Sequence, residues 1–263
     1  MNFQNKTVFI VGSTGIAAAT AKLASKAGAQ VFISSRTEEN CRALCEEIKA
    51  SGGIAAYFAA DQTQAGQVQN AVESCLQKFG KIDAAFNVAG ISGRRFGDGP
   101  LHECSEEGWD ITLDTNAKGM FLFCRAQLKQ MLQQPIGENG LRGTILNMAS
   151  VLGFAPQRDF FATHAYAASK GAIISMSRSA ASYYAPHKIR INVIAPSLVS
   201  TPMSQRAQTN QDILDLMKTK QPLVEDLISA DDVARAALFL LSDEARVITG
   251  DVLTVDAGWC VSG

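Results

Sequence analysis

Tyr166 and Lys170 are the two residues whose types and spacing point most directly to chemistry. They stand four positions apart in the segment Tyr-Ala-Ala-Ser-Lys, and residues i and i+4 are neighbours on one face of a helix. At about 4 Å and an effective dielectric constant of about 20, an ammonium group stabilises a phenolate by roughly 4 kcal/mol. This interaction lowers a phenol pKa of about 10 by up to roughly 3 units, so the pair predicts a tyrosine that exchanges protons near neutral pH.

The spacing of this pair is weak evidence alone, because a chain with four tyrosines can contain it by chance. A second motif lies near the N-terminus, where an apolar run ends at Gly12-Ser13-Thr14-Gly15 and a helix-forming segment follows. This order predicts a strand, a glycine turn and a helix. Such a turn lets backbone N–H groups approach a pyrophosphate, although a tight turn without a ligand explains the two glycines equally well.

Short apolar runs alternate with longer helical patterns along the whole chain. This alternation predicts an α/β fold with a mainly parallel sheet covered by helices on both faces. The irregular stretches 91–104 and 197–225 follow strand ends, where open α/β sheets bind ligands, and residues 134–142 are expected to form a surface loop. Strands are predicted at residues 7–12, 30–35, 54–60, 83–88, 143–148, 189–194 and 251–255, and helices at 15–27, 37–51, 63–79, 105–133, 164–184 and 229–242.

Composition limits the function classes. The chain has 263 residues, 47% of them apolar, and a net charge of -1 with both signs mixed along the sequence. This favours one domain over residues 1–263 with a large core, and it gives no basic patch for nucleic acid and no polybasic membrane anchor. Since no apolar run approaches the roughly 18 residues of a membrane span or resembles a signal peptide, we expect a soluble, cytoplasmic protein.

The six cysteines show neither a Cys-x-x-Cys pair nor histidines at zinc spacing, so no metal site is predicted. Cys41 and Cys45 have helical spacing and are expected to face the core as reduced, structural thiols.

Taken together, the motifs resemble the short-chain dehydrogenase/reductase family, and the likeness covers nearly the whole chain. It implies a doubly wound (Rossmann) sheet of about seven strands and hydride transfer between NAD(P)(H) and a carbonyl or secondary alcohol. The motifs that carry it, in chain order, are the glycine turn, Asn87-Val88-Ala89-Gly90, Asn116, Ser150, Tyr166 with Lys170, and the segment from Pro196 to Thr201.

The resemblance implies catalytic roles for Asn116, Ser150, Tyr166 and Lys170. Ser150 and Tyr166 would hold a carbonyl oxygen, and Tyr166 would act as the general acid or base. Lys170 would lower the phenol pKa and hold the nicotinamide ribose, and Asn116 would form a helix kink that holds a water next to the lysine. The alternatives are a strand-end cap for Ser150 and a tolerated surface position for Asn116. His164 is interpreted as a pocket-lining or helix-start residue rather than a base.

The resemblance also implies a set of cofactor-binding residues. Two of them have structural alternatives. A helix cap is the alternative for Asp61 and is compatible with a place at the adenine, while Asn87 is interpreted primarily as a sheet-stabilising group. The set comprises Gly12, Ser13, Thr14, Gly15 and Ile16 at the pyrophosphate, Ser35 and Arg36 at the adenine ribose, Asp61 and Gln62 at the adenine, Asn87, Ala89 and Gly90 near the ribose, Tyr166 and Lys170, and Pro196, Val199 and Thr201 at the nicotinamide.

Ser35 and Arg36 follow the second predicted strand, where an acidic residue would favour NAD. A cation there pairs with a 2′-phosphate, so NADP(H) is favoured over NAD(H). The alternative is an arginine that only caps a surface helix.

Several positions depart from the family pattern. The glycine turn is one residue shorter, with Val11 for threonine and Ala17 for the last glycine, and the gap between Ser150 and Tyr166 is longer than is common. These departures support a rival hypothesis, a nucleotide-binding sensor or scaffold without turnover. An enzyme is preferred because a binding module has no chemical need for all four catalytic residues. Further departures are Val88, Ser197 and Ala257.

The substrate is expected to be a small or medium organic molecule with a carbonyl or secondary alcohol, bound among loops near residues 91–104, 151–165 and 197–225. The last of these loops is expected to form a lid. Family members commonly form tetramers, so a homotetramer or homodimer is expected. Five apolar residues on these loops are candidates to line the pocket: Phe154, Phe160, Phe161, Met203 and Leu216.

Overall fold

A single parallel sheet organises the computed structural model, which describes residues 1–262. The strand order is β3-β2-β1-β4-β5-β6-β7, so the chain reverses direction across the sheet between β1 and β4. This arrangement confirms the doubly wound α/β fold and creates a switch point between β1 and β4. The strands are β1 (Thr7–Val11), β2 (Gln30–Ser35), β3 (Ile54–Ala59), β4 (Ala84–Asn87), β5 (Gly143–Met148), β6 (Ile189–Pro196) and β7 (Val252–Val255).

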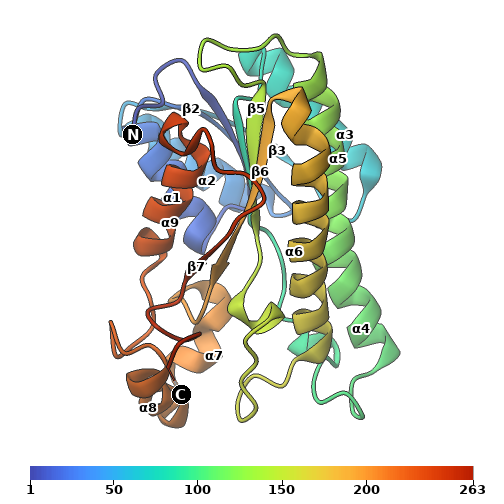
Figure 1. Ribbon diagram of the computed structural model, residues 1–263, viewed down its shortest axis with the longest axis vertical. Coiled ribbons are helices and arrows are strands. Elements are labelled where there is room, and N and C mark those ends of the chain that lie inside the picture. Colours follow the sequence, from blue (N-terminus) through green and yellow to red (C-terminus); the bar gives the residue numbers. More distant parts are fainter. Residues whose placement is uncertain (263) are drawn as a thin grey trace.

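Helices cover both faces of the sheet (Figure 1). On one face lie α1 (Gly15–Lys26), α2 (Glu38–Ala50) and α9 (Ala230–Leu241), and on the other lie α3 (Ala65–Phe79), α4 (Glu106–Leu113), α5 (Gly119–Gln133) and α6 (His164–Tyr184). Each face carries its own apolar core. The central strands are buried from end to end, which explains why they appear in the sequence as continuous apolar runs.

Two predicted segments differ from the structure. The helix predicted over residues 105–133 is divided by a π-helical turn at Asp114–Lys118. The stretch 197–225, predicted to be irregular, contains α7 (Gln205–Gln208) and α8 (Gln211–Lys220). The Asn210 side chain caps α8 by accepting a hydrogen bond from the Ile213 backbone N–H at 3.2 Å. The apolar pattern of α8 extends over too few turns to be distinguished from a loop in the sequence.

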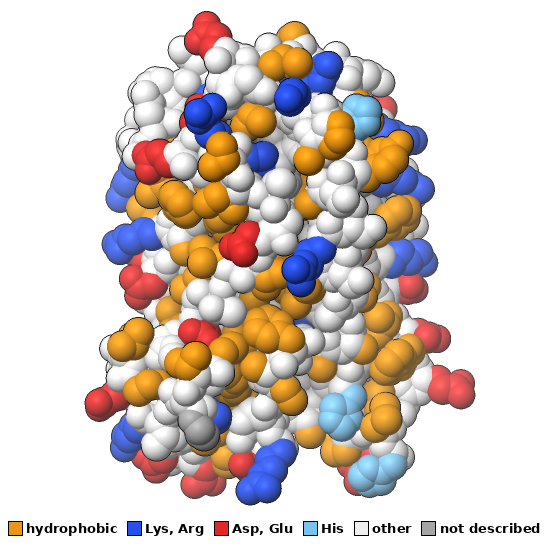
Figure 2. All heavy atoms as spheres, in the orientation of Figure 1, with side chains coloured by type: hydrophobic (Ala, Val, Ile, Leu, Met, Phe, Trp, Pro, Cys, Tyr) orange, Lys and Arg blue, Asp and Glu red, His pale blue; other side chains and the backbone are white. Residues whose placement is uncertain are grey.

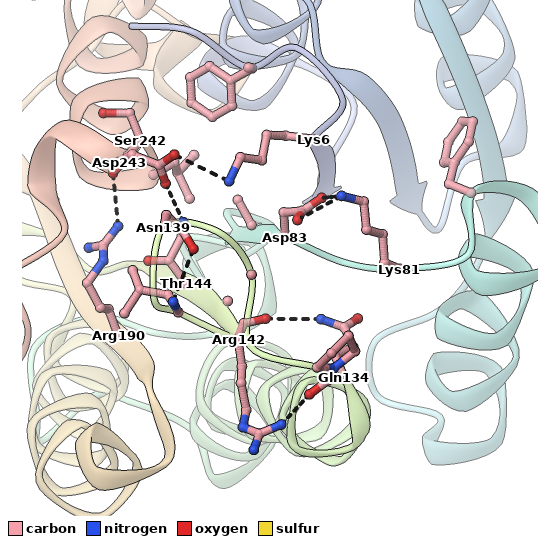
Figure 3. Close-up of a pocket in the computed structure, with 18 of the residues that line it drawn as sticks. Lys6, Lys81, Asp83, Gln134, Asn139, Arg142, Thr144, Arg190, Ser242 and Asp243 are labelled. Carbon is pink, nitrogen blue, oxygen red and sulfur yellow. Dashed lines mark hydrogen bonds and ion pairs between the residues drawn. The ribbon is translucent and has the colours of Figure 1, made fainter.

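A cavity of about 420 Å³ lies at the edge of the sheet where the strands begin, opposite the ligand-binding edge (Figure 3). The buried Arg190 guanidinium lies on its wall and donates hydrogen bonds to the carbonyls of Leu240, Ser242 and Ile248 at 2.9, 3.1 and 3.1 Å. Burial lowers the pKa of Arg190 to about 10, against the opposing effect of the Asp243 charge. These bonds join β6 to the end of α9 and to the segment before β7, so the cavity wall is structural.

Replacing Arg190 with methionine tests whether its hydrogen bonds stabilise the fold. In Arg190→Met three carbonyls lose their donor, and we expect the free energy of unfolding to fall by about 3 kcal/mol. Urea denaturation followed by circular dichroism measures the change. Arg246→Met, which removes an exposed arginine next to the same segment, should change the value by less than about 0.5 kcal/mol. Equal losses in both variants would contradict the structural role of Arg190.

Candidate active site

A cleft of about 1120 Å³ lies at the edge where the strands end, across the switch point between β1 and β4. This is where doubly wound sheets bind ligands. Every residue predicted for the site lines this cleft except Asn87 and Asn116. The lining includes Gly12, Ser13, Thr14, Gly15, Ile16, Ser35, Arg36, Asp61, Gln62, Ala89, Gly90, Ser150, Tyr166, Lys170, Pro196, Val199 and Thr201.

The glycine turn opens the N-terminus of α1 toward the cleft. Gly12 and Gly15 have φ values of +127° and +53°, where side chains other than glycine are strained. A Cβ on Gly12 would lie 2.9 Å from the Cβ of Ala17, so Ala17 in place of glycine is accommodated because residue 12 has none. The Thr14 N-cap makes no side-chain capping bond, which leaves the first N–H groups of α1 for an anion. The shortened turn thus fits a pyrophosphate.

Asp61 and Gln62 organise the cleft wall after β3. Asp61 Oδ1 accepts hydrogen bonds from the N–H and hydroxyl of Thr63 at 2.9 and 2.8 Å. The N-cap of α3 is Gln64, without a side-chain bond, so the alternative interpretation of Asp61 as the cap of this helix is wrong: the chain makes an additional turn first. Gln62 donates to the carbonyls of Ala89 and Thr115 at 3.3 and 2.7 Å. It thereby joins the end of β4 to the π-helical turn.

Asn87 lies beneath the cleft and does not line it. Its amide exchanges hydrogen bonds with Gln127 at 3.0 and 2.8 Å and donates to Asn147 Oδ1 at 3.0 Å. Asn147 in turn donates to Ser177 Oγ at 2.9 Å. This buried network joins β4, β5, α5 and α6, so the sheet-stabilising interpretation of Asn87 is confirmed and direct contact with a cofactor in the cleft is not supported.

Asn116 forms the centre of the π-helical turn and has 0% of its surface exposed, so its interpretation as a surface residue is wrong. Its Nδ2 donates to the Ile91 carbonyl at 2.9 Å and to Ser169 Oγ at 3.0 Å, while its Oδ1 accepts from the Ile91 N–H at 2.8 Å. A Cβ on Gly90 would lie 2.9 Å from Asn116 Oδ1. The predicted kink is confirmed, and it ties α6 to the loop after β4.

Ser150, Tyr166 and Lys170 come together on the cleft wall between β5 and α6. Ser150 Oγ accepts the Leu152 N–H at 3.2 Å, capping a short 3₁₀ turn, so its capping role coexists with its place in the cleft. Lys170 Nζ donates to the Met148 carbonyl at 3.0 Å and lies 5.5 Å from the centroid of the Tyr166 ring. The three side chains therefore share one wall.

Burial controls the titration of this pair. It raises the pKa of Tyr166 to about 12, opposed by a hydrogen bond with Ser150, and it lowers the pKa of Lys170 to about 8. The predicted lowering of the Tyr166 pKa by Lys170 is contradicted for these side chains, because burial is the largest influence on the phenol and raises its pKa. At neutral pH the phenol is therefore protonated and suited to donate a proton.

Asp98 is a site residue that the sequence analysis missed. Its two carboxylate oxygens accept the backbone N–H groups of Ala165 and Tyr166 at 3.0 and 2.9 Å, at the start of α6. It is 5% exposed and belongs to the loop after β4. The capping residue lies 67 residues before Ala165, whose N–H it accepts, so no local signal identifies it. His164 begins α6, is exposed and does not line the cleft, which confirms its helix-start interpretation.

The loop after β6 is held by Gln221, a second missed residue. Its buried side chain accepts hydrogen bonds from Ser197 Oγ at 2.5 Å and the Leu198 N–H at 2.8 Å. It also donates to the Asp226 carbonyl at 2.5 Å. Ser197, which replaces the glycine of the family pattern, is thus the partner that connects this loop to the end of α8.

An apolar wall borders the substrate end of the cleft. Phe161, Met203 and Trp259 line it, and the rings of Phe161 and Trp259 pack edge to face with centroids 5.6 Å apart. Of the other predicted pocket residues, Phe160 and Leu216 pack in the cluster around Trp259. Phe154 is 47% exposed and lies outside the lining, so its predicted place in the pocket is wrong.

Cys41 and Cys45 are buried with free thiols on the core side of α2, as predicted. Within residues 1–262 no group of three His, Cys, Asp or Glu side chains is placed to hold a metal ion. No helix in that range has the length and apolarity needed to span a bilayer. On the face in Figure 2, side chains of both charges are interspersed.

The fold and the cleft define a class: a doubly wound sheet with an anion-binding glycine turn and a Ser-Tyr-Lys set is typical of a nucleotide-dependent oxidoreductase. Residues 10–260 match the family model described as enoyl-(acyl carrier protein) reductase. The chain is 35% identical to a 2,5-dichloro-2,5-cyclohexadiene-1,4-diol dehydrogenase of Sphingobium indicum, with 98% of each chain covered. It is 34% identical to an A-factor type gamma-butyrolactone 1′-reductase of Streptomyces virginiae, with 95% of this chain and 93% of the relative covered.

A solved structure of a reductase has the same fold as this chain. A 3-ketoacyl-(acyl-carrier-protein) reductase from Brucella melitensis, crystallised with NADH, superposes with a TM-score of 0.86 at 30% identity and covers 98% of this chain and 99% of its own. The chain belongs to the short-chain dehydrogenase/reductase family of NAD(P)-dependent oxidoreductases.

The Asp98 cap gives a testable prediction. Asp98→Ala removes both acceptors from the N-terminus of α6, and we expect the free energy of unfolding to fall by about 2 kcal/mol. Oxidoreductase activity should fall as well, because the same bonds position the Tyr166 backbone. Urea denaturation and single-turnover kinetics measure the two effects. Asp98→Asn keeps one acceptor, so its free energy of unfolding should lie between those of Asp98→Ala and the unaltered protein. An unaltered stability in Asp98→Ala would refute the cap.

Proposed function

We propose that this chain, as one domain, transfers hydride between NADP(H) and a carbonyl or secondary alcohol of a small organic molecule, with Tyr166 as general acid and base. The observation that carries the proposal is the convergence of Ser150, Tyr166 and Lys170 on one wall of a cleft whose far end is the anion-binding turn of α1. The lining of the same cleft includes the predicted pyrophosphate, adenine and nicotinamide residues.

The residues present fit a dinucleotide. The free N–H groups at the start of α1 suit the pyrophosphate. Gly90 lines the cleft without a side chain, because a Cβ there would collide with Asn116. Lys170 would hold the nicotinamide ribose, while Val199 and Thr201 on the loop after β6 would contact the carboxamide. The Thr201 N–H is bonded to Ser204 Oγ at 3.1 Å in a capping box, which fixes this loop.

The reaction balances with the chain's own residues. When bound, NADPH supplies one hydrogen and two electrons to the carbonyl carbon. The carbonyl oxygen accepts hydrogen bonds from the Ser150 hydroxyl and the Tyr166 phenol, and the phenol proton passes to that oxygen as the alcohol forms. Lys170, through its positive charge, stabilises the tyrosinate left behind. Asn116, holding the kink beside α6, would position a water that returns the proton from solvent.

Replacing Tyr166 by phenylalanine tests this function. Tyr166→Phe removes one hydroxyl, so we expect turnover to fall about a thousandfold while nucleotide binding is preserved. Oxidation of NADPH with a panel of ketones, followed at the nucleotide absorbance, measures turnover, and nucleotide fluorescence measures binding. Activity close to that of the unaltered chain would remove Tyr166 from its role. Nucleotide binding without turnover by the unaltered chain would favour the sensor alternative.

Preference for NADP(H) is supported by the end of β2. Ser13, Ser35, Arg36 and Asn40 line this part of the cleft with hydroxyl, guanidinium and amide groups. The Ser13 and Ser35 hydroxyls are 2.7 Å apart. Within residues 1–262 no acidic side chain forms an ion pair with Arg36. A free guanidinium beside hydroxyl groups suits the 2′-phosphate of NADP(H).

We expect Arg36→Ala to raise the Kd for NADPH about tenfold or more while the Kd for NADH changes by less than about threefold. The charge-assisted bond to the 2′-phosphate is lost only with NADPH. Fluorescence titration gives both constants. Arg42→Ala, which removes an exposed cation of the neighbouring helix α2 outside the cleft, should leave both unchanged. Equal losses for the two nucleotides in Arg36→Ala would contradict the preference.

Association into a homotetramer or homodimer is also part of the proposal. Exposed apolar side chains on α4 and α5, among them Trp109, Phe121 and Leu132, support it, because monomeric surfaces rarely gather such residues.

A further inference from the structure

Three loops of the cleft meet at one backbone oxygen, the carbonyl of Phe160. Arg94 of the loop after β4 donates to it through Nη2 at 2.6 Å. Arg206 of α7 donates to it through its own Nη2 at 3.2 Å. Both arginines line the cleft. Two guanidinium groups from segments more than a hundred residues apart are therefore neighbours at the substrate end of the cleft.

These two positive charges lack a carboxylate partner. No ion pair formed within the described part of the chain includes Arg94 or Arg206. The Asp98 charge favours the charged form of Arg94, but both carboxylate oxygens already accept the N–H groups at the start of α6. Burial, followed by the charge of Arg206, lowers the pKa of Arg94. Two guanidinium groups that share one neutral carbonyl repel each other, and an anion bound between them would relieve this repulsion.

Neighbouring arginines do have partners. The Arg95 guanidinium stacks over the Phe96 ring at 4.6 Å, and Arg158 pairs with Asp159 at 3.3 Å. Each guanidinium carries five N–H donors, and Arg94 and Arg206 each use one of their side-chain donors on Phe160. The unused donors form a fork geometry that matches the oxygens of an anionic acid.

We propose that Arg94 and Arg206 bind an anionic acid group of the substrate, a carboxylate, phosphate or sulfonate. The proposal rests on the proposed function, since the carbonyl of the same molecule must reach Ser150 and Tyr166. The apolar wall of Phe161 and Trp259 borders the same end of the cleft and suits a hydrocarbon segment between the two groups. The substrate class is thus a keto acid, or the matching hydroxy acid, whose acid group is separated from the reacting carbon.

Methyl ketones ending in a carboxylate, compared with their methyl esters, test this class directly. The acid and ester of each chain length differ by one charge. With NADPH and the unaltered protein, we expect kcat/KM for the best acid to exceed that for its ester at least about tenfold, and the excess to shrink as salt is added. Arg94→Ala and Arg206→Ala should each lower kcat/KM for the acid and leave that for the ester nearly unchanged.

Arg158→Ala is the matched control. It removes a cation from the loop that carries Phe160, with 93% of that side chain exposed and outside the cleft lining, and it should preserve the preference for the acid. If acid and ester react equally in the unaltered protein, the inference is overturned while the proposed function stands. If the arginine variants lower both substrates equally, the pair only fastens the loops together, and the inference is again overturned.

A binding measurement separates failure of this inference from failure of the proposed function. If no ketone is reduced, the proposed function fails, and the anion site is judged by calorimetry with hexanoate and methyl hexanoate on the NADPH-saturated protein. Hexanoate binding that the Arg94→Ala and Arg206→Ala changes abolish would support the site. Equal binding of hexanoate and its ester, or binding of neither, would overturn it.

Discussion

The requirement to satisfy the polar groups of α6 away from water is the constraint on which the active site depends. This helix carries a buried ammonium, a half-buried phenol and a buried hydroxyl. The Met148 carbonyl accepts from Lys170, Asn116 donates to Ser169, and Asp98 accepts the backbone N–H of Tyr166. An unsatisfied buried group would cost about 1 to 3 kcal/mol, so these loops must hold their positions for the helix to be stable. Stability and catalytic geometry therefore depend on the same contacts.

The parallel sheet makes these contacts available. In such a sheet the carboxyl ends of all strands meet at one edge, so the loops after β1, β4, β5 and β6 converge there although they are far apart in sequence. The amide network of Asn87, Gln127 and Asn147 fixes the strands beneath that edge. On the opposite edge Arg190 has the corresponding role, since it holds the segments that precede β7. Polar networks at both ends therefore keep β4, β5 and β6 aligned below the reacting groups.

The sequence predicts those features of the fold and the site that depend on neighbouring residues in the chain. Apolar runs identify all seven strands, most clearly the central ones that are buried along their length. The family resemblance indicates the helix kink at Asn116, which the structure shows as a π-helical turn. Asp98 and Gln221 escape such reasoning because each acts on a distant segment. The cap expected from Asp61 fails because the chain turns once more before α3 begins. The titration of Tyr166 is mispredicted for a related reason: spacing gives the position of Lys170, but desolvation depends on everything packed around the pair.

The charge of the cleft also depends on which distant residues the fold brings together. A net charge of -1 describes the whole chain, yet the cleft is lined by the cations Arg36, Arg94, Arg95, Lys170 and Arg206 against the acids Asp61, Asp110 and Asp114. Five cations thus face three carboxylates, and Asp114 is already paired with Lys118 at 3.2 Å. A cleft with low-dielectric walls concentrates such a field and attracts anionic ligands, whatever the balance of charge on the outer surface. The proposed ligands would place negative charge beside Arg36 at one end and beside Arg94 and Arg206 at the other. Lys170 lies between them, where a negative charge develops on Tyr166 during proton transfer.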